Sequence, residues 1–126
     1  MPAGKQIGTY EATFTSVRIV DNDGDHRIFE GSYSGAVTGD LNATIMGTMT
    51  FEGTDDRGTL SDRGVGYFDS GDIAPGKGQG VYWRNGNGVW ETRAAFILPE
   101  QALVGEGQIT LSKGNLTMSG KVFELT

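Results

Sequence analysis

The side chains best suited to bind a metal ion gather in one short segment, Asp21-Asn22-Asp23-Gly24-Asp25-His26. Aspartates at alternate positions can begin a calcium-binding loop, because their hard carboxylate oxygens converge on the ion. The rest of such a loop is missing, since His26 stands where a glycine is needed and Ser32 where a bidentate glutamate is needed. The segment therefore predicts an ordinary turn between two strands, and no metal is expected.

Acid-base and nucleophilic chemistry has few candidates. His26 is the only histidine and the chain contains no cysteine, so a catalytic triad, a histidine-ligated zinc site or a haem would depend on His26 alone. No Gly-x-Ser-x-Gly segment is present, and the Gly-x-Gly pairs at 78–80 and 86–88 lack a helix that could bind phosphate. We expect no cofactor, and the catalytic residues, if any exist, are not identified; a Tyr, a Glu or His26 would move the proton.

The aromatic residues are more informative as a set. Alternation along their segments can place nine of them on one side of their strands: Tyr10, Phe14, Phe29, Tyr33, Phe51, Phe68, Trp83, Trp90 and Phe96. Such a set can form a packed core or line a cavity for a small apolar ligand. The many glycines and alanines beside them leave volume unfilled and favour the cavity. The predicted ligand-binding residues are Tyr10, Phe14, Tyr33, Met49, Trp83 and Trp90, with Tyr10 as a polar anchor.

The residues from Gly78 to Leu98 carry the clearest signal for local structure. Two aromatic, β-branched runs flank Asn85-Gly86-Asn87-Gly88, which is typical of a β-hairpin. A turn centred on Gly86-Asn87 places Trp83 opposite Trp90 on one face. The other face then carries Tyr82, Arg84, Glu91 and Arg93. A register slip of one residue would exchange the two faces.

Composition limits the remaining possibilities. With 126 residues the chain is expected to form one domain, residues 1–126. A net charge of −6 with scattered basic residues argues against nucleic acid as a partner. No apolar run is long enough for a signal peptide or a membrane span, so we expect no membrane contact and a cytoplasmic protein, with secretion behind a removed signal as the alternative.

Short turns divide the chain into eight segments of alternating polarity. The expected strands are 5–20, 27–41, 43–52, 59–69, the two arms of the hairpin, 103–111 and 116–125, with 70–77 as the longest irregular connection. At most one helical turn is expected, near Pro99. Sequential strands joined by short turns predict an all-β, eight-stranded antiparallel up-and-down barrel, because closure of such a meander removes exposed edges. An open sandwich is the alternative, but its crossings need longer connections.

The segment Ile28-Phe29-Glu30-Gly31-Ser32-Tyr33 resembles the Ile-Phe-Glu-Gly-x-Tyr strand of plant allene oxide cyclases, whose eight-stranded barrel is shared in outline with dirigent proteins. The resemblance implies a barrel, an apolar oxylipin-type substrate, no cofactor and a trimer. It transfers no catalytic residue to this chain. The expected barrel is also similar in form to those of lipocalins and other calycins, whose early Gly-x-Trp is Gly8-Thr9-Tyr10 here.

Two functions remain open. The barrel is expected to bind a small hydrophobic molecule in its central cavity; alternatively it is a cofactor-independent isomerase, cyclase or lyase that acts on a small apolar substrate in the same cavity. Apolar residues expected on outward faces (Ile19, Val89, Ile97 and Phe123) predict a homo-oligomer, either a dimer or a trimer.

Overall fold

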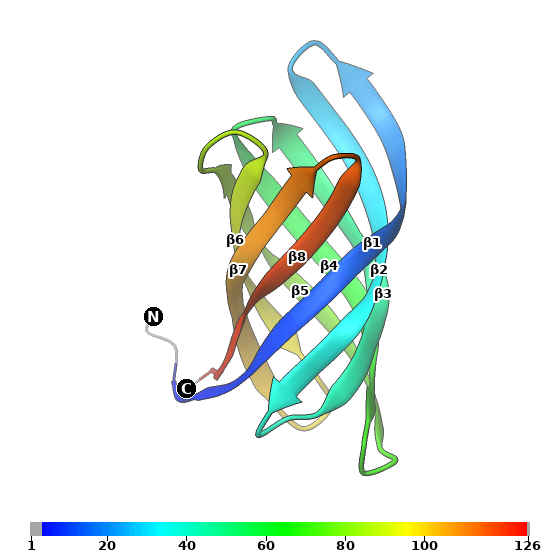
Figure 1. Ribbon diagram of the computed structural model, residues 1–126, viewed down its shortest axis with the longest axis vertical. Coiled ribbons are helices and arrows are strands. Elements are labelled where there is room, and N and C mark those ends of the chain that lie inside the picture. Colours follow the sequence, from blue (N-terminus) through cyan, green and yellow to red (C-terminus); the bar gives the residue numbers. More distant parts are fainter. Residues whose placement is uncertain (1–3, 126) are drawn as a thin grey trace.

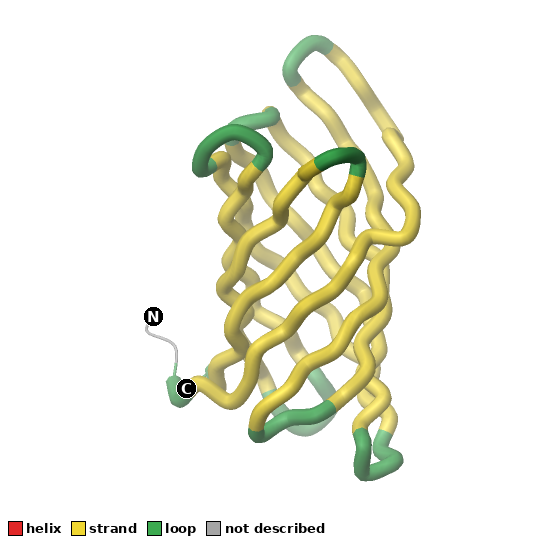
Figure 2. Tube along the Cα trace, in the orientation of Figure 1, coloured by secondary structure: helices red, strands yellow, loops and turns green. Residues whose placement is uncertain are grey.

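The computed structural model describes residues 4–125, and within them all regular structure is β-strand. The eight strands are β1 (Gln6–Asp23), β2 (His26–Gly39), β3 (Ala43–Thr54), β4 (Arg57–Phe68), β5 (Ile73–Arg84), β6 (Val89–Ile97), β7 (Ala102–Ser112) and β8 (Asn115–Glu124). Each strand pairs antiparallel with its neighbours in sequence, and β8 pairs with β1 to close the barrel (Figures 1 and 2). The predicted eight-stranded meander barrel is confirmed.

The barrel has two dissimilar ends (Figure 2). Both described termini lie at the end that carries the β2–β3, β4–β5 and β6–β7 connections, called the terminal end below. At the opposite end the β1–β2 hairpin projects beyond the barrel. This projection arises because β1 pairs with β8 only up to Thr13 but with β2 as far as Asp23, and register shifts after Phe14 and Ile19 bend the strand on the way.

One detail of the predicted strands is wrong. The connection at 70–77 is much shorter, since β5 begins at Ile73 and includes Pro75. Pro75 lies opposite Val65 on β4, whereas the pairing of β5 with β6 begins only at Lys77. The missing N–H of this proline therefore removes no hydrogen bond between β5 and β6. The segment near Pro99 forms a bend at residues 99–100 before β7 starts at Ala102, which agrees with the expectation of at most one helical turn there.

The register predicted for the 78–98 hairpin is wrong by one residue. The N–H of Asn85 donates to the carbonyl oxygen of Val89 at 2.8 Å, which leaves a three-residue loop in which Gly86 and Gly88 adopt positive φ. Trp90 therefore pairs with Arg84, and Tyr82 pairs with Thr92. Because side chains alternate along a strand, Tyr82 now faces the interior while Trp83 lies on the outer wall, 44 % exposed.

The four apolar residues expected on outward faces divide into two groups. Ile19 and Ile97 are more than half exposed, at 54 % and 60 %, whereas Val89 and Phe123 are partly buried. Ile19 pairs with Phe29, on the side of the sheet that continues the barrel interior, and is exposed because the hairpin extends beyond the barrel. Assembly into a dimer or trimer stays a prediction.

Glycines inside the strands receive the aromatic rings of neighbouring strands. Tyr33 on β2 pairs with Gly47 on β3, which pairs with Gly64 on β4, so the tyrosine ring lies across β3 and its hydroxyl reaches β4. The same arrangement recurs where Tyr10 lies over Gly120 and Gly107, and where Tyr82 lies over Gly58 and Gly53. A side chain at such a glycine would occupy the space of the ring.

We expect Gly47→Ala to lower the free energy of unfolding by about 1–3 kcal/mol. A Cβ at Gly47 would lie 2.6 Å from the carbonyl oxygen of Arg63 and 2.7 Å from the hydroxyl of Tyr33, so both the wall and the ring must move. Gly66→Ala is the matched control, because the nearest atom to its Cβ would be a ring carbon of Phe68, at 3.3 Å. Urea unfolding of both variants measures the difference, and equal stabilities would contradict the role assigned to Gly47.

Candidate functional site

The interior of the barrel divides into a packed half and a hollow half. The half away from the terminal end is filled by four rings, in which Phe51 contacts each of the other three, Phe14, Phe29 and Tyr82. Tyr82 donates a hydrogen bond to the carbonyl oxygen of Thr54 at 2.6 Å, and Trp90 donates to that of Asp55 at 2.7 Å. These two bonds fix the aromatic cluster to the β3–β4 turn.

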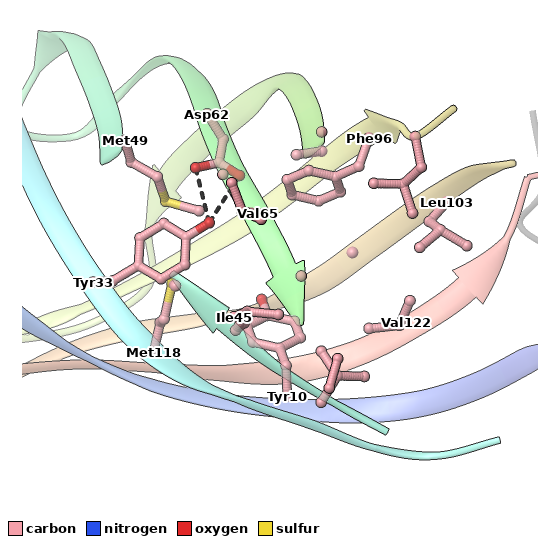
Figure 3. A pocket seen from close by; sticks show the side chains of 18 of the residues that line it. Tyr10, Tyr33, Ile45, Met49, Asp62, Val65, Phe96, Leu103, Met118 and Val122 are labelled. Carbon is pink, nitrogen blue, oxygen red and sulfur yellow. Dashed lines mark hydrogen bonds between the residues drawn. The ribbon is translucent and has the colours of Figure 1, made fainter. Parts of the chain in front are cut away.

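The hollow half is a cavity of about 140 Å³ that extends toward the terminal end. Leu41 and Leu98, which lie in the β2–β3 and β6–β7 connections, form part of its lining. Small residues on five strands leave the space unfilled: Ala43, Gly64, Gly66, Ala74, Gly76, Ala94 and Gly105. Aliphatic and aromatic side chains supply most of the remaining wall, including Ile45, Phe96, Leu103 and Val122 (Figure 3).

Asp62 is the only carboxylate in this apolar lining among the described residues. It comes from β4, is only 6 % exposed, and accepts hydrogen bonds from the Tyr33 hydroxyl at 3.0 Å to each carboxylate oxygen (Figure 3). Burial raises the pKa of Asp62 to about 6, although the hydrogen bonds from Tyr33 and from the backbone of Arg63 oppose that rise. Its protonation state therefore changes close to neutral pH.

The two tyrosines of the cavity are held as neutral phenols. Burial raises the pKa of Tyr33, and the adjacent charge of Asp62 and the hydrogen bond to it raise it further. Burial also raises the pKa of Tyr10, against a smaller opposing effect of its hydrogen bond with the Thr92 side chain. Both phenols are thus hydrogen-bonding groups rather than ionised bases at neutral pH.

Three of the six predicted ligand-binding residues, Tyr10, Tyr33 and Met49, line the cavity. Phe14 belongs to the packed half, where it makes T-shaped contacts with Tyr33 and Phe51. Trp90 packs against the same cluster without lining the cavity, and Trp83 lies outside on the barrel wall as a consequence of the register.

Sequence reasoning missed Asp62 and Thr92. The signal for Asp62 was present, because the alternation through Leu60, Gly64 and Phe68 places residue 62 on the same inward face. The one-residue error in the hairpin register concealed Thr92, which pairs with Tyr82 and lines the cavity.

No residue of the Asp21–His26 segment lines this cavity. Arg27 holds the turn by donating to Asn22 Oδ1 at 2.6 Å and to the carbonyl oxygen of Gly24 at 3.1 Å. His26 Nε2 lies 3.9 Å from a carboxylate oxygen of Glu52, and neither residue lines the cavity. Within residues 4–125 no three His, Cys, Asp or Glu side chains come close enough together to hold a metal ion.

Comparison with known proteins supports the fold only. No family model matches the chain, and no curated protein sequence matches it. Among solved structures, a protein of unknown function from Clostridium acetobutylicum ATCC 824 is similar with a TM-score of 0.71 and 15 % identity, over 98 % of this chain and 100 % of that one. A conserved protein of unknown function from Rhodopseudomonas palustris is similar with a TM-score of 0.66 and 13 % identity, over 94 % and 96 %. The allene oxide cyclase resemblance is supported at the level of the barrel alone.

The described residues include no helix long and apolar enough to span a membrane.

We expect the free energy of unfolding to fall by roughly 2–3 kcal/mol between pH 4 and pH 7, relative to an Asp62→Asn variant. Folded Asp62 has a pKa of about 6, above the ordinary value of 3.8, so the folded state holds this proton more tightly than the unfolded state. The resulting stability is complete below pH 4 and is lost as the pH rises through 6.

Urea unfolding of both proteins across this pH range measures the difference. The other carboxyl groups are common to the two proteins, so their contributions cancel in the comparison. Parallel pH profiles would contradict the raised pKa.

Proposed function

We propose that the barrel binds a small, mainly apolar molecule in the hollow half of its interior. The observation that carries the proposal is the cavity of about 140 Å³, walled by aliphatic and aromatic side chains from most of the strands. An engineered apolar cavity of about 150 Å³ in another protein stays free of water and binds benzene. A single aromatic ring or a short branched chain is thus of the right size.

The division of the interior supports the same proposal. Interlocked rings stabilise the packed half, so the barrel does not depend on filling the other half for its core. Empty space beside apolar walls forgoes dispersion contacts, and an apolar ligand would restore them. The allene oxide cyclase resemblance implies an apolar substrate and agrees with this class of ligand.

We expect toluene to shift the ¹³C-methyl NMR signals of Met49 and Met118 in saturable fashion, because both side chains line the cavity. Met46 is an internal control on the same strand as Met49, since it is exposed on the outer surface. Saturable shifts at Met49 and Met118 with a constant Met46 signal would support the proposal. Absence of any shift up to the solubility limit of toluene would overturn it.

Ala94→Leu should weaken this toluene binding at least tenfold by filling the cavity. Ala95→Leu is the matched control, because Ala95 is the next residue of β6 and does not line the cavity. Thermal unfolding by circular dichroism establishes that both variants are folded. Equal loss of binding in the two variants would argue against the cavity as the binding site.

A second candidate function is a cofactor-independent isomerase, cyclase or lyase in the same cavity. The specific observation in its favour is Asp62, a buried carboxyl group whose pKa of about 6 suits proton transfer near neutral pH, with the Tyr33 hydroxyl 3.0 Å away. An apolar substrate folded against this pair would need no metal or coenzyme for the movement of one proton.

The enzymatic function predicts that wild-type protein and Asp62→Asn co-purify with different molecules. The variant should retain unreacted substrate, whereas the wild type should carry product, distinguishable by chromatographic retention even when the two are isomers. Extraction and mass spectrometry of both samples provide the measurement. The same molecule in both would favour simple binding.

A further inference from the structure

We propose that the Asp62 carboxylate, which lies beside Tyr33, gives the cavity selectivity for small amphiphiles whose buried end is an ammonium group, and against those that end in a carboxylate. The inference rests on the proposed function, because it names the chemical class of ligand for the same cavity. The inference concerns the polar end of the ligand, whose charge is not determined by the apolar lining.

The first argument is the charge of the lining. Asp62 is the only carboxylate in the cavity, and no Lys, Arg or His within residues 4–125 lines it. The residues that pair with Asp62 on either side, Met49 of β3 and Gly78 of β5, carry no charge. The titratable groups that face it from other strands are Tyr33 of β2 and Tyr10 of β1, both neutral.

Arg63 follows Asp62 in the chain but gives no compensation inside the cavity. Its side chain is exposed, since alternation along β4 points it outward. Its neighbour across the β4–β5 ladder is Lys77, which also lies on the outer wall. An ionised Asp62 therefore creates an uncompensated negative charge in an apolar chamber, where an anion from a ligand would be repelled and a cation attracted. The net charge of −6 of the whole chain acts in the same direction.

The second argument is hydrogen-bonding capacity. A carboxylate offers about four lone-pair positions, and the hydroxyl of Tyr33 and the backbone N–H of Arg63 use only part of them. An ammonium group brings three donors and no acceptor, so it fits the remaining positions. A ligand carboxylate brings only acceptors and would face Asp62 oxygens without a shared proton.

The third argument is the position of the pair. Asp62 and Tyr33 lie beside the packed aromatic half, because the Tyr33 ring makes a T-shaped contact with Phe14. Leu41 and Leu98 line the cavity from the connections at the terminal end. A ligand that enters from the terminal end thus meets the charge last. Its apolar part would lie along Phe96 and Leu103 (Figure 3).

Four probes of similar size test the selectivity: benzylamine, benzyl alcohol, toluene and benzoate, each titrated against the ¹³C-methyl signals of Met49 and Met118 at pH 7.5. We expect benzylamine to bind at least tenfold more tightly than benzoate, with benzyl alcohol between them. In Asp62→Asn the preference for benzylamine over benzoate should shrink to less than threefold, while toluene affinity changes by less than threefold. Tyr33→Phe, which keeps the carboxylate, should retain the preference.

A pH titration of the wild type keeps the test independent of any variant. Benzylamine affinity should rise about tenfold from pH 5 to pH 7.5, as Asp62 passes from about one-tenth ionised to almost fully ionised, and toluene affinity should not rise. Toluene binding without a preference for benzylamine over benzoate would overturn this inference and leave the proposed function standing. Failure of every probe to bind, toluene included, would overturn the proposed function itself.

Discussion

The packing of tyrosine rings across paired glycines is the interaction on which the rest of the structure depends. A ring such as that of Tyr33 starts on one strand, crosses the glycine of the next and reaches the strand beyond. Three consecutive strands are thereby held by one side chain, and the ring lies along the wall instead of projecting into the centre. The high glycine content, 21 of 126 residues, thus serves the curvature of the sheet and also makes room for these rings.

The hollow half follows from this packing. Where rings lie against the wall and the facing residues are glycine or alanine, as around Tyr10 and Gly105, the interior stays empty. Phenylalanines instead fill the other half, with Phe29 stacked on Phe51 at a centroid distance of 4.7 Å. The polar consequence of the same geometry is the Asp62–Tyr33 contact, since Gly47 lets the tyrosine hydroxyl pass over β3 to the carboxyl group.

Much of the fold was predictable from local signals. Alternation in segments such as Tyr10–Phe14, together with short Gly-containing turns, is enough to predict the strands. The short connections then require each strand to pair with its neighbour in sequence, which defines a meander. The hairpin register was not predictable, because Asn85–Gly88 suits loops of two or of three residues, and the choice depends on which face the rest of the barrel buries. That one-residue difference moved Trp83 from the predicted site to the surface and brought Tyr82 inside.

The candidate site was predictable in part for a related reason. Tyr10, Tyr33 and Met49 lie on strands whose alternation is regular, so their inward direction could be inferred, but the boundary between packed and hollow halves depends on ring contacts between strands distant in sequence. Asp62 was overlooked because an isolated acid in a strand is usually solvated. Its environment is known only once Tyr33, 29 residues away in the chain, is placed beside it.

The presence of Asp62 is hard to explain by folding alone. An apolar residue or an asparagine at this inward position would avoid the desolvation of a charge. The pKa of Asp62, raised by burial to about 6, reflects that penalty after the opposing hydrogen bonds from Tyr33 and the backbone of Arg63. Tyr33 does not require a charged partner either, since any acceptor would satisfy its hydroxyl. Asp62 thus weakens the fold at the pH where it is ionised, and it lies in the half of the interior that is left open. Both properties are the ones expected of a group that contacts the proposed ligand.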